Sequence, residues 1–174
     1  MPLDAIDLNI LKELQADAKL TNAELATRVA LSPSPCLTRV RALEDGGVID
    51  RYVTLLDPKA VGLTVSVFIQ VSLDRQVEPA LERFEHAVSL FDEVMECYLM
   101  TGDADYLLRV IVADLPELER FIVTRLSRIE GVSGIRSSIA LKSVKYQTAV
   151  PLPAPATARR QGRQGRQGDD KGRR

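Results

Sequence analysis

The spacing of apolar residues changes at Asp57-Pro58, and this change constrains the fold more than any other feature. Before it, apolar side chains recur at three- and four-residue steps, as they do in helices. After it, segments with strand-like alternation take turns with helical segments. We therefore expect two small domains, over residues 1–57 and 58–153, followed by a separate segment over residues 154–174.

Residues 1–57 are expected to fold as a helix-turn-helix domain. A capping box, Thr21-Asn22-Ala23-Glu24, opens one short helix, because the threonine hydroxyl accepts a backbone N–H while the glutamate reaches back. Ser32-Pro33 opens the next helix, which ends at Gly46-Gly47. Two short helices joined by a tight turn are typical of helix-turn-helix proteins. The three helices are expected over residues 4–16, 21–29 and 33–45.

The third of these helices has an outward face that suits the major groove of DNA. At 100° per residue, Val40 lies inward with Cys36, Leu37 and Leu43, and the opposite face carries small side chains between two arginines. Small residues let a helix enter the groove, while hydroxyls and guanidinium groups reach base edges or phosphates. An exposed helix with solvated arginines is the alternative. The candidate DNA-contacting residues are Ser34, Thr38, Arg39 and Arg41.

The segment after this helix predicts a small hairpin, or wing. Val48-Ile49 and residues 52–56 have strand character on either side of Asp50-Arg51. Arg51 is a further candidate for DNA contact, with a solvated turn residue as the equal alternative. Residues 1–57 hold six basic and nine acidic residues, whereas isolated DNA-binding domains are usually basic. We therefore expect a few placed arginines to act in more than one copy of the chain.

Residues 58–153 predict an α+β fold of the ferredoxin-like, βαββαβ kind. Two helices would cover one face of an antiparallel sheet, which leaves the other face as a large apolar patch unless a second copy covers it. A dimer at least is therefore expected. Strands are expected over residues 64–73, 93–101, 106–113 and 132–141, with a fifth at 144–150 and helices over residues 77–88 and from 115 onward.

The turn between the second and third of these strands, Gly102-Asp103-Ala104-Asp105, is the candidate ligand site. Glycine lets backbone N–H groups face outward, where they can hold a carboxylate, and aspartates can hold an ammonium group. Together these groups fit a free amino acid. From these residues alone, an ordinary aspartate-rich turn remains the alternative.

The sequence offers no catalytic, metal or cofactor site. The single histidine, His86, has no carboxylate or cysteine at a catalytic or metal-binding spacing, and two cysteines, Cys36 and Cys97, make no disulfide framework. No phosphate-binding loop or nucleophile motif is present. An enzyme would need an acid–base pair that we do not find, and a purely structural DNA-organising protein would not need the turn. With no apolar run or secretion signal, we expect a cytoplasmic protein.

The formal net charge of −1 hides an uneven distribution along the chain. Residues 157–174 repeat Arg-Gln-Gly three times and hold seven basic and two acidic side chains, so this segment carries +5 against −6 for residues 1–156. Such a composition buries almost nothing and predicts disorder. The segment could help to hold DNA or RNA without sequence preference, or have no specific role.

Several motifs in the chain are distinctive when they are taken together. The first is Leu3-Asp4-x-x-Asp7, and it is followed by Asn22-Ala23-Glu24-Leu25-Ala26. The most extensive runs from Leu31-Ser32-Pro33-Ser34-Pro35-Cys36-Leu37 to Glu44. Thr101-Gly102-Asp103-Ala104-Asp105-Tyr106-Leu107-Leu108 adds a second, independent motif. Together these motifs resemble the Lrp/AsnC (feast/famine, leucine-responsive regulatory protein) family of transcriptional regulators, and the resemblance covers residues 3 to about 150.

This resemblance implies a winged helix-turn-helix joined to an effector domain. Family members pair through their sheets into dimers, which assemble into octamers or similar rings, and a small amino acid binds near the Gly102, Asp103 and Asp105 motif. Control of amino-acid metabolism genes is also implied. Neighbouring strand residues would line the effector pocket, and the candidates are Tyr98, Met100, Thr101, Ser137 and Ser138.

Overall fold

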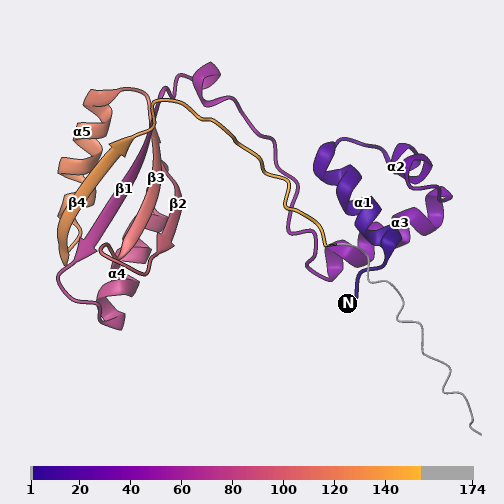
Figure 1. The fold of residues 1–174 in the computed structure, drawn as a ribbon, viewed down its shortest axis with the longest axis horizontal. Coiled ribbons are helices and arrows are strands. Elements are labelled where there is room, and N and C mark those ends of the chain that lie inside the picture. The colour runs from indigo at the N-terminus through magenta and orange to yellow at the C-terminus, as the bar shows by residue number, and fades with distance from the viewer. Residues whose placement is uncertain (1, 154–174) are drawn as a thin grey trace, which may run out of the picture. The chain divides into compact units, whose positions relative to one another are not determined.

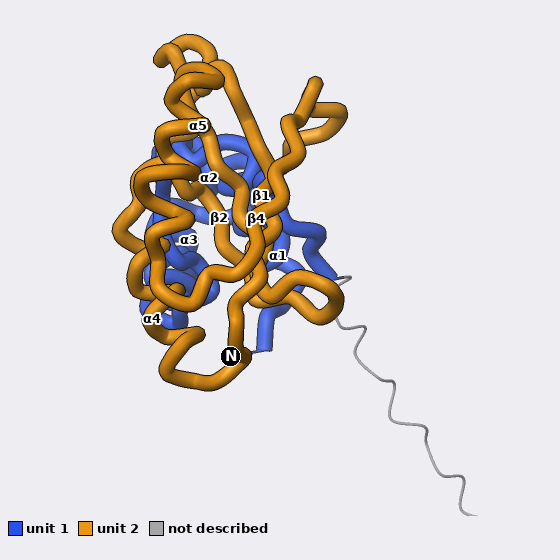
Figure 2. Tube along the Cα trace, turned by 90° about the vertical axis from the view of Figure 1, so that its left-hand side faces the viewer, with its two compact units in different colours: residues 1–53, 147–174 blue, residues 54–146 orange. Residues whose placement is uncertain are grey.

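The computed structural model describes residues 2–153, so the prediction of a disordered tail over residues 154–174 lies outside the described part. The chain divides into two compact units (Figure 2). One unit contains residues 2–53 together with 147–153, and the other contains residues 54–146. Residues 147–153 thus belong with the first unit, although the sequence places them in the second domain.

The first unit contains the three predicted helices, α1 (Ala5–Ala16), α2 (Asn22–Arg28) and α3 (Pro33–Asp45). Asp4 caps α1 in a capping box with Asp7, and Thr21 caps α2 in a box with Glu24. Ser32 precedes α3 without a side-chain cap, so Pro33 alone favours its start. The core they share consists of Ile10, Leu11, Leu25, Ala26, Val29, Cys36 and Leu43.

The two strands of the hairpin predicted after α3 do not form in the structure. Residues 51–57 run without regular structure, and all seven are exposed. Alternating apolar residues make a strand only where a neighbouring strand can receive their backbone hydrogen bonds. Within the described residues, 48–56 pair with no strand. For the same reason the predicted fifth strand at 144–150 is wrong.

The second unit has the predicted βαββαβ order (Figure 1). Its four strands form one antiparallel sheet in the order β2-β3-β1-β4, with β3 and β1 at the centre. The core lies between this sheet and the two helices. The elements are β1 (Val65–Leu73), α4 (Glu78–Ser89), β2 (Val94–Leu99), β3 (Tyr106–Val112), α5 (Leu115–Thr124) and β4 (Val132–Ile139). Short 3-10 turns occupy Pro58–Val61 and Leu126–Arg128.

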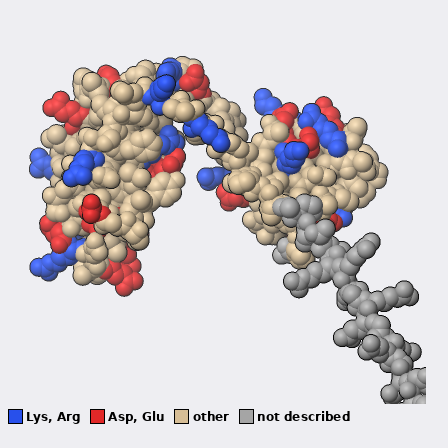
Figure 3. All heavy atoms as spheres, in the orientation of Figure 1, with Lys and Arg blue, Asp and Glu red and all other residues tan. Residues whose placement is uncertain are grey.

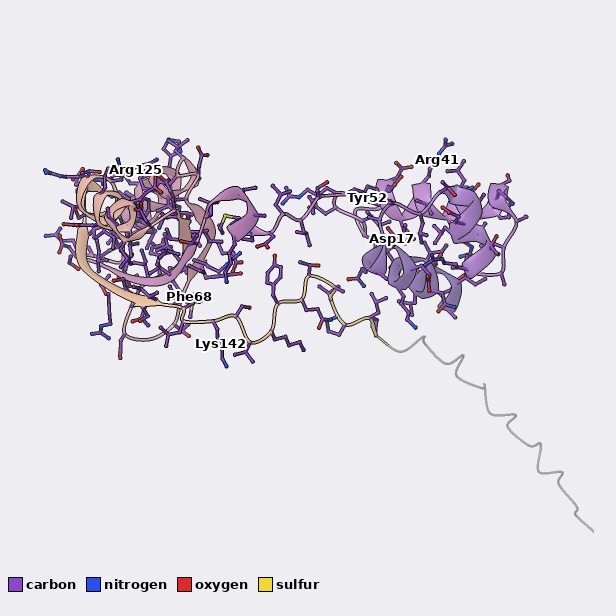
Figure 4. The ribbon with its side chains drawn as sticks, turned by 90° about the horizontal axis from the view of Figure 1, so that it is seen from above. Asp17, Arg41, Tyr52, Phe68, Arg125 and Lys142 are labelled. Atoms are coloured by element: carbon purple, nitrogen blue, oxygen red, sulfur yellow. The ribbon has the colours of Figure 1, made fainter. Side chains whose placement is uncertain are left out.

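The face of the sheet away from these helices mixes apolar and charged side chains. Phe68 and Tyr98 are 41% and 52% exposed there, and Phe68 is labelled in Figure 4. Arg109 lies opposite Phe68 on β1 and opposite Glu96 on β2, and it donates from Nε to Glu96 Oε1 at 2.7 Å. The open face is therefore less uniformly apolar than the sequence predicts, although it still exposes two large aromatic rings.

Candidate DNA-binding surface and effector turn

The exposed face of α3 carries most of the predicted DNA-contacting residues. Ser34, Thr38 and Arg41 are all exposed, whereas Cys36 and Leu43 are fully buried. The Thr38 hydroxyl donates to the Ser34 carbonyl oxygen at 3.1 Å, which fixes its orientation. Arg41 projects into solvent (Figure 4), and no ion pair forms with it in residues 2–153.

Two predictions for α3 differ from the structure. Leu37 was expected to face inward but is 38% exposed. Arg39 binds the start of α1 instead of pointing freely outward, because its Nη1 lies 2.7 Å from Asp7 Oδ1 and 2.8 Å from Asp4 Oδ2. The two hydrogen-bonded carboxylates raise the pKa of Arg39. Hydrogen bonding from the Asp7 backbone N–H and from Arg39 lowers the pKa of Asp4. Arg39 therefore ties α3 to α1.

Arg51 lies in the extended segment that follows α3. Its side chain is 78% exposed, and Nε lies 3.5 Å from Oδ2 of its neighbour Asp50. An ion pair this exposed holds its partners weakly. The guanidinium is therefore accessible to an anion, but it sits on an extended segment and not at the tip of a hairpin. Figure 3 shows basic and acidic side chains interspersed on the visible face of each unit.

The turn between β2 and β3 exposes backbone donors. Gly102 has a φ of +132°, a region that favours glycine because other residues are strained there. Within the described residues, the backbone N–H groups of residues 101–104 make no hydrogen bond, whereas those of Met100 and Asp105 do. Asp103 is exposed beside these free N–H groups. The turn can therefore offer several donors and one free carboxylate to a ligand.

Both carboxylate oxygens of Asp105 are held by protein groups, and its assignment as an effector-binding residue stays a prediction. Asp105 is only 7% exposed. Its Oδ2 accepts from the Leu73 backbone N–H at 2.6 Å, and its Oδ1 accepts from Gln76 Nε2 at 2.5 Å. Both oxygens thus hold the turn to the end of β1 and the loop that follows it. Burying this carboxylate requires such partners.

The remaining candidates for ligand contact fall into two groups. Tyr98, Met100 and Thr101 are exposed and lie in β2 or in the turn, so the structure brings them near Gly102 and Asp103. Ser137 and Ser138 lie in β4, at the opposite edge of the sheet from β2. Three strand spacings, about 14 Å, separate these edges. The two serines also point to opposite faces, since they pair with Ile69 and Phe68 respectively.

A cavity of about 340 Å³ between α4 and β2 was not predicted from the sequence. It is lined by Glu85, Val88, Cys97, Leu99 and Tyr106, among others. The Tyr106 hydroxyl donates to Glu85 Oε1 at 2.8 Å. Burial, together with the negative charge of Glu85, raises the pKa of Cys97 to about 11, so its thiol stays protonated at neutral pH. The lining residues come from α4, from β2 and from the start of β3, and the cavity depends on how these three elements pack together.

Neither a metal site nor a membrane span is found in residues 2–153. No group of three or more histidine, cysteine, aspartate or glutamate side chains is arranged there to hold a metal ion. None of the helices in this range has the length and apolar character needed to cross a bilayer.

Both units match family models. Residues 3–50 match the winged helix-turn-helix DNA-binding model, and residues 66–150 match the Lrp/AsnC ligand binding domain. The chain is 46% identical over 150 residues to the Bkd operon transcriptional regulator of Pseudomonas aeruginosa, covering 86% of this chain and 98% of that protein. It is 42% identical to the leucine-responsive regulatory protein of Escherichia coli, with 86% and 92% covered.

Solved structures agree with these matches. A Neisseria meningitidis transcriptional regulator in complex with L-Met has a TM-score of 0.83 at 42% identity, covering 86% of this chain and 96% of that chain. An AsnC family regulator from Agrobacterium tumefaciens has a TM-score of 0.82 at 41% identity, with 86% and 97% covered. With its helix-turn-helix unit and effector unit, the chain belongs to the Lrp/AsnC family of amino-acid-responsive, DNA-binding transcription regulators and is not an enzyme.

Proposed function

We propose that this regulator acts in the cytoplasm on amino-acid metabolism genes and responds to an amino acid with an apolar side chain. The first unit would bind DNA and the second would bind the effector. The names of two relatives, a Bkd operon regulator and a leucine-responsive protein, support such targets. The L-Met complex of the Neisseria relative supports an apolar effector.

The free backbone N–H groups of residues 101–104 are the observation that carries the effector assignment. Successive unpaired N–H groups form a concavity that binds anions, and here they would hold the effector carboxylate. Asp103 would hold the ammonium group, and Tyr98 and Met100 would contact the apolar side chain. Thr101 adds a hydroxyl. Asp105 would act indirectly, by holding the turn against Leu73 and Gln76.

Ser137 and Ser138 join this site only if a second copy of the chain brings its β4 edge to the turn. Self-association is supported by the open sheet face, where Phe68 and Tyr98 expose large aromatic surfaces. We propose a dimer through this face and a higher assembly, such as an octamer, built from dimers. Sedimentation of the purified protein tests this, and a monomer at micromolar concentration would contradict it.

On the DNA side, we propose that Ser34, Thr38 and Arg41 contact the major groove from the exposed face of α3. Arg41 is the strongest candidate for reading a base, since its guanidinium is exposed and extends from the helix that enters the groove. Arg51 would contact a phosphate. Arg39 would hold α3 in place through Asp4 and Asp7 and contribute to DNA binding mainly by positioning.

A thermal-shift screen of the twenty amino acids against the full chain tests the effector assignment. Leucine or methionine should raise the melting temperature, because a ligand that binds only the folded state stabilises it. A response limited to charged amino acids would contradict the apolar assignment. No response to any amino acid would contradict the proposed effector site.

A further inference from the structure

The cavity between α4 and β2 lies on the opposite side of β2 from the ring of Tyr98. Leu99, which lines the cavity, pairs with Tyr106 of β3, and the Tyr106 side chain is buried between the sheet and its helices. Tyr98 exposes its ring on the open face instead. None of residues 100–105 lines the cavity, so it is separate from the effector turn. Its volume of about 340 Å³ falls within the range of small-ligand pockets, roughly 300–1,000 Å³.

The cavity contains one carboxylate that no cation of the protein neutralises. Glu85 Oε1 accepts a hydrogen bond from the buried Tyr106 hydroxyl at 2.8 Å, which fixes the carboxylate in the wall. Glu85 forms no ion pair within residues 2–153. The other carboxylate in the lining, Glu96, is paired with Arg109 at 2.7 Å. The negative charge of Glu85 is therefore available to a ligand.

The position of α4 adds to this negative potential. Glu85, Val88 and Ser89 belong to the C-terminal half of α4, and the C-terminal end of a helix carries a partial negative charge that favours cations. No lysine, arginine or histidine is among the residues that line the cavity. Burial and the hydrogen bond to Glu85 raise the pKa of Tyr106, so its hydroxyl stays neutral. The site thus favours a cation and offers nothing to hold an anion.

The rest of the lining is largely apolar, which distinguishes an organic cation from a metal ion. Val88 and Val94 are buried or half-buried, and Met95 and Leu99 are 52% and 60% exposed. These side chains offer none of the oxygen ligands that hard metal ions require. No group of three or more metal-binding side chains occurs in residues 2–153. A short apolar chain that ends in an ammonium group matches both parts of the cavity.

We propose that this cavity binds a primary alkylamine, with its ammonium group on Glu85 and its apolar chain between α4 and β2. The ammonium would donate to the second oxygen of Glu85 and to the Tyr106 hydroxyl oxygen, which keeps acceptor capacity while it donates. A free amino acid is the poorer ligand, because its carboxylate would lie near Glu85 without a cation to hold it. Decarboxylation of apolar amino acids yields amines of this kind, so the protein would recognise them separately from its effector.

The first test uses Cys97 as a reporter of the cavity. Cys97 lines the cavity and is exposed, whereas Cys36, the other cysteine of the chain, is fully buried. The full chain is treated with the neutral thiol reagent dithiodipyridine in the presence of isoamylamine hydrochloride, sodium isovalerate or sodium chloride. When isoamylamine fills about nine-tenths of the cavities, the reaction of Cys97 should slow about tenfold, because the reagent reaches only the empty fraction. Isovalerate and sodium chloride should leave the rate unchanged.

An unchanged rate with isoamylamine would overturn the proposal. Equal slowing by isovalerate, which has the same apolar chain but a carboxylate, would overturn it as well. The same reaction in Asp103→Asn separates this site from the effector turn. Isoamylamine should protect Cys97 in D103N as it does in the wild type, and leucine should not. Loss of protection by isoamylamine in D103N would place the amine at the effector turn and contradict a separate site.

The second test removes the charge of Glu85. Glu85→Gln keeps an oxygen for the Tyr106 hydroxyl, and Glu82→Gln is the matched control, since Glu82 is exposed on the same helix outside the cavity lining. In calorimetric titrations with isoamylamine, E85Q should lose at least about tenfold in affinity, as expected for a hydrogen bond between charged groups. E82Q should bind like the wild type. Wild-type affinity in E85Q would overturn the proposal.

A second pair of variants gives a result that does not depend on the stability of E85Q. Leu99→Lys places an ammonium group in the cavity, where it would compete with the amine for Glu85. Leu90→Lys is the matched control, because Leu90 is 66% exposed and lies outside the lining. L99K should lose isoamylamine binding and L90K should keep it. Undiminished binding in L99K would contradict the proposed site.

Discussion

The recognition helix and the effector turn each contain two charged candidates of the same sign, two residues apart, and the structure separates the members of each pair. On α3, Arg41 is exposed while Arg39 binds Asp4 and Asp7. In the turn, Asp103 is exposed while Asp105 binds Leu73 and Gln76. In both regions one charged side chain is exposed to solvent, namely Arg41 or Asp103. The other member of the pair, Arg39 or Asp105, holds the helix or turn in place through contacts within the protein.

The two regions differ in how deeply the holding residue is buried. Arg39 keeps a third of its side chain exposed, whereas Asp105 is 7% exposed and satisfies a backbone N–H. Water can replace the partners of a guanidinium that is one-third exposed, but it cannot easily reach a buried N–H. The effector turn should therefore be far more sensitive than the recognition helix to the loss of its holding residue.

The largest effect is expected for Asp105→Ala. The substitution leaves the Leu73 N–H without an acceptor, and an unsatisfied buried donor costs about 1–3 kcal/mol. We expect the free energy of unfolding, measured in urea, to fall by this amount and effector binding to be lost with it. The matched change Asp103→Ala should alter stability by less than about 0.5 kcal/mol, as exposed substitutions do. Equal stability of the two variants would contradict the division of roles.

Arg41→Ala should have the next largest effect, on DNA binding alone. Loss of a guanidinium that reads a base weakens specific binding by about 1–3 kcal/mol. A mobility-shift assay on a cognate promoter fragment measures this effect, and urea unfolding should show unchanged stability. Wild-type affinity in this variant would remove Arg41 from the recognition surface.

Arg39→Ala should act more weakly and through stability. The ion pair joins a guanidinium that is 33% exposed to an Asp7 side chain that is 8% exposed. Solvent reaches the pair from the arginine side, and the Asp4 backbone N–H still donates to Asp7 Oδ2 in the variant, so we expect a loss of about 1 kcal/mol. We expect a small decrease in the unfolding free energy of the N-terminal unit, with DNA affinity reduced less than in the Arg41 variant. A greater loss of DNA affinity than in R41A, with stability unchanged, would show that Arg39 contacts DNA directly.

The smallest effect is expected from acid. The folded state lowers the pKa of Asp4 below its ordinary value of 3.8, through hydrogen bonds from the Asp7 N–H and from Arg39. The ionised Asp4 carboxylate therefore contributes its full stabilisation of the folded state at pH values above that ordinary value. This contribution is lost as the pH falls through the lower pKa of the folded state. In Asp4→Asn this part of the acid sensitivity should disappear, as followed by circular dichroism between pH 5 and 2. An identical acid profile in both proteins would argue against this linkage.

Local signals predicted local structure well. The capping box at Thr21 and the glycines after α3 correctly indicated the helices, because these interactions span only a few residues. Alternation also predicted the βαββαβ order. The hairpin after α3 and the strand at 144–150 were wrong because alternation does not reveal whether a partner strand is present.

The roles within each charged pair could not be predicted, since the deciding partners are distant in sequence. Asp105 meets Leu73 and Gln76, which are 32 and 29 residues away, and Arg39 meets Asp4 and Asp7, which are 35 and 32 residues away. Gln15 meets Val150 across 135 residues. No local pattern marks any of these contacts, so composition and spacing could identify the candidate charges but not assign their functions.

Calorimetric titration of leucine and methionine into the wild type, Asp103→Asn and Asp105→Asn tests this division most directly. The wild type should bind one of the two amino acids. D103N should keep wild-type stability and lose at least tenfold in affinity, because the neutral amide no longer attracts the ammonium group. D105N should lose affinity together with stability. Wild-type affinity in D103N, or loss of affinity in D105N without any loss of stability, would contradict the account.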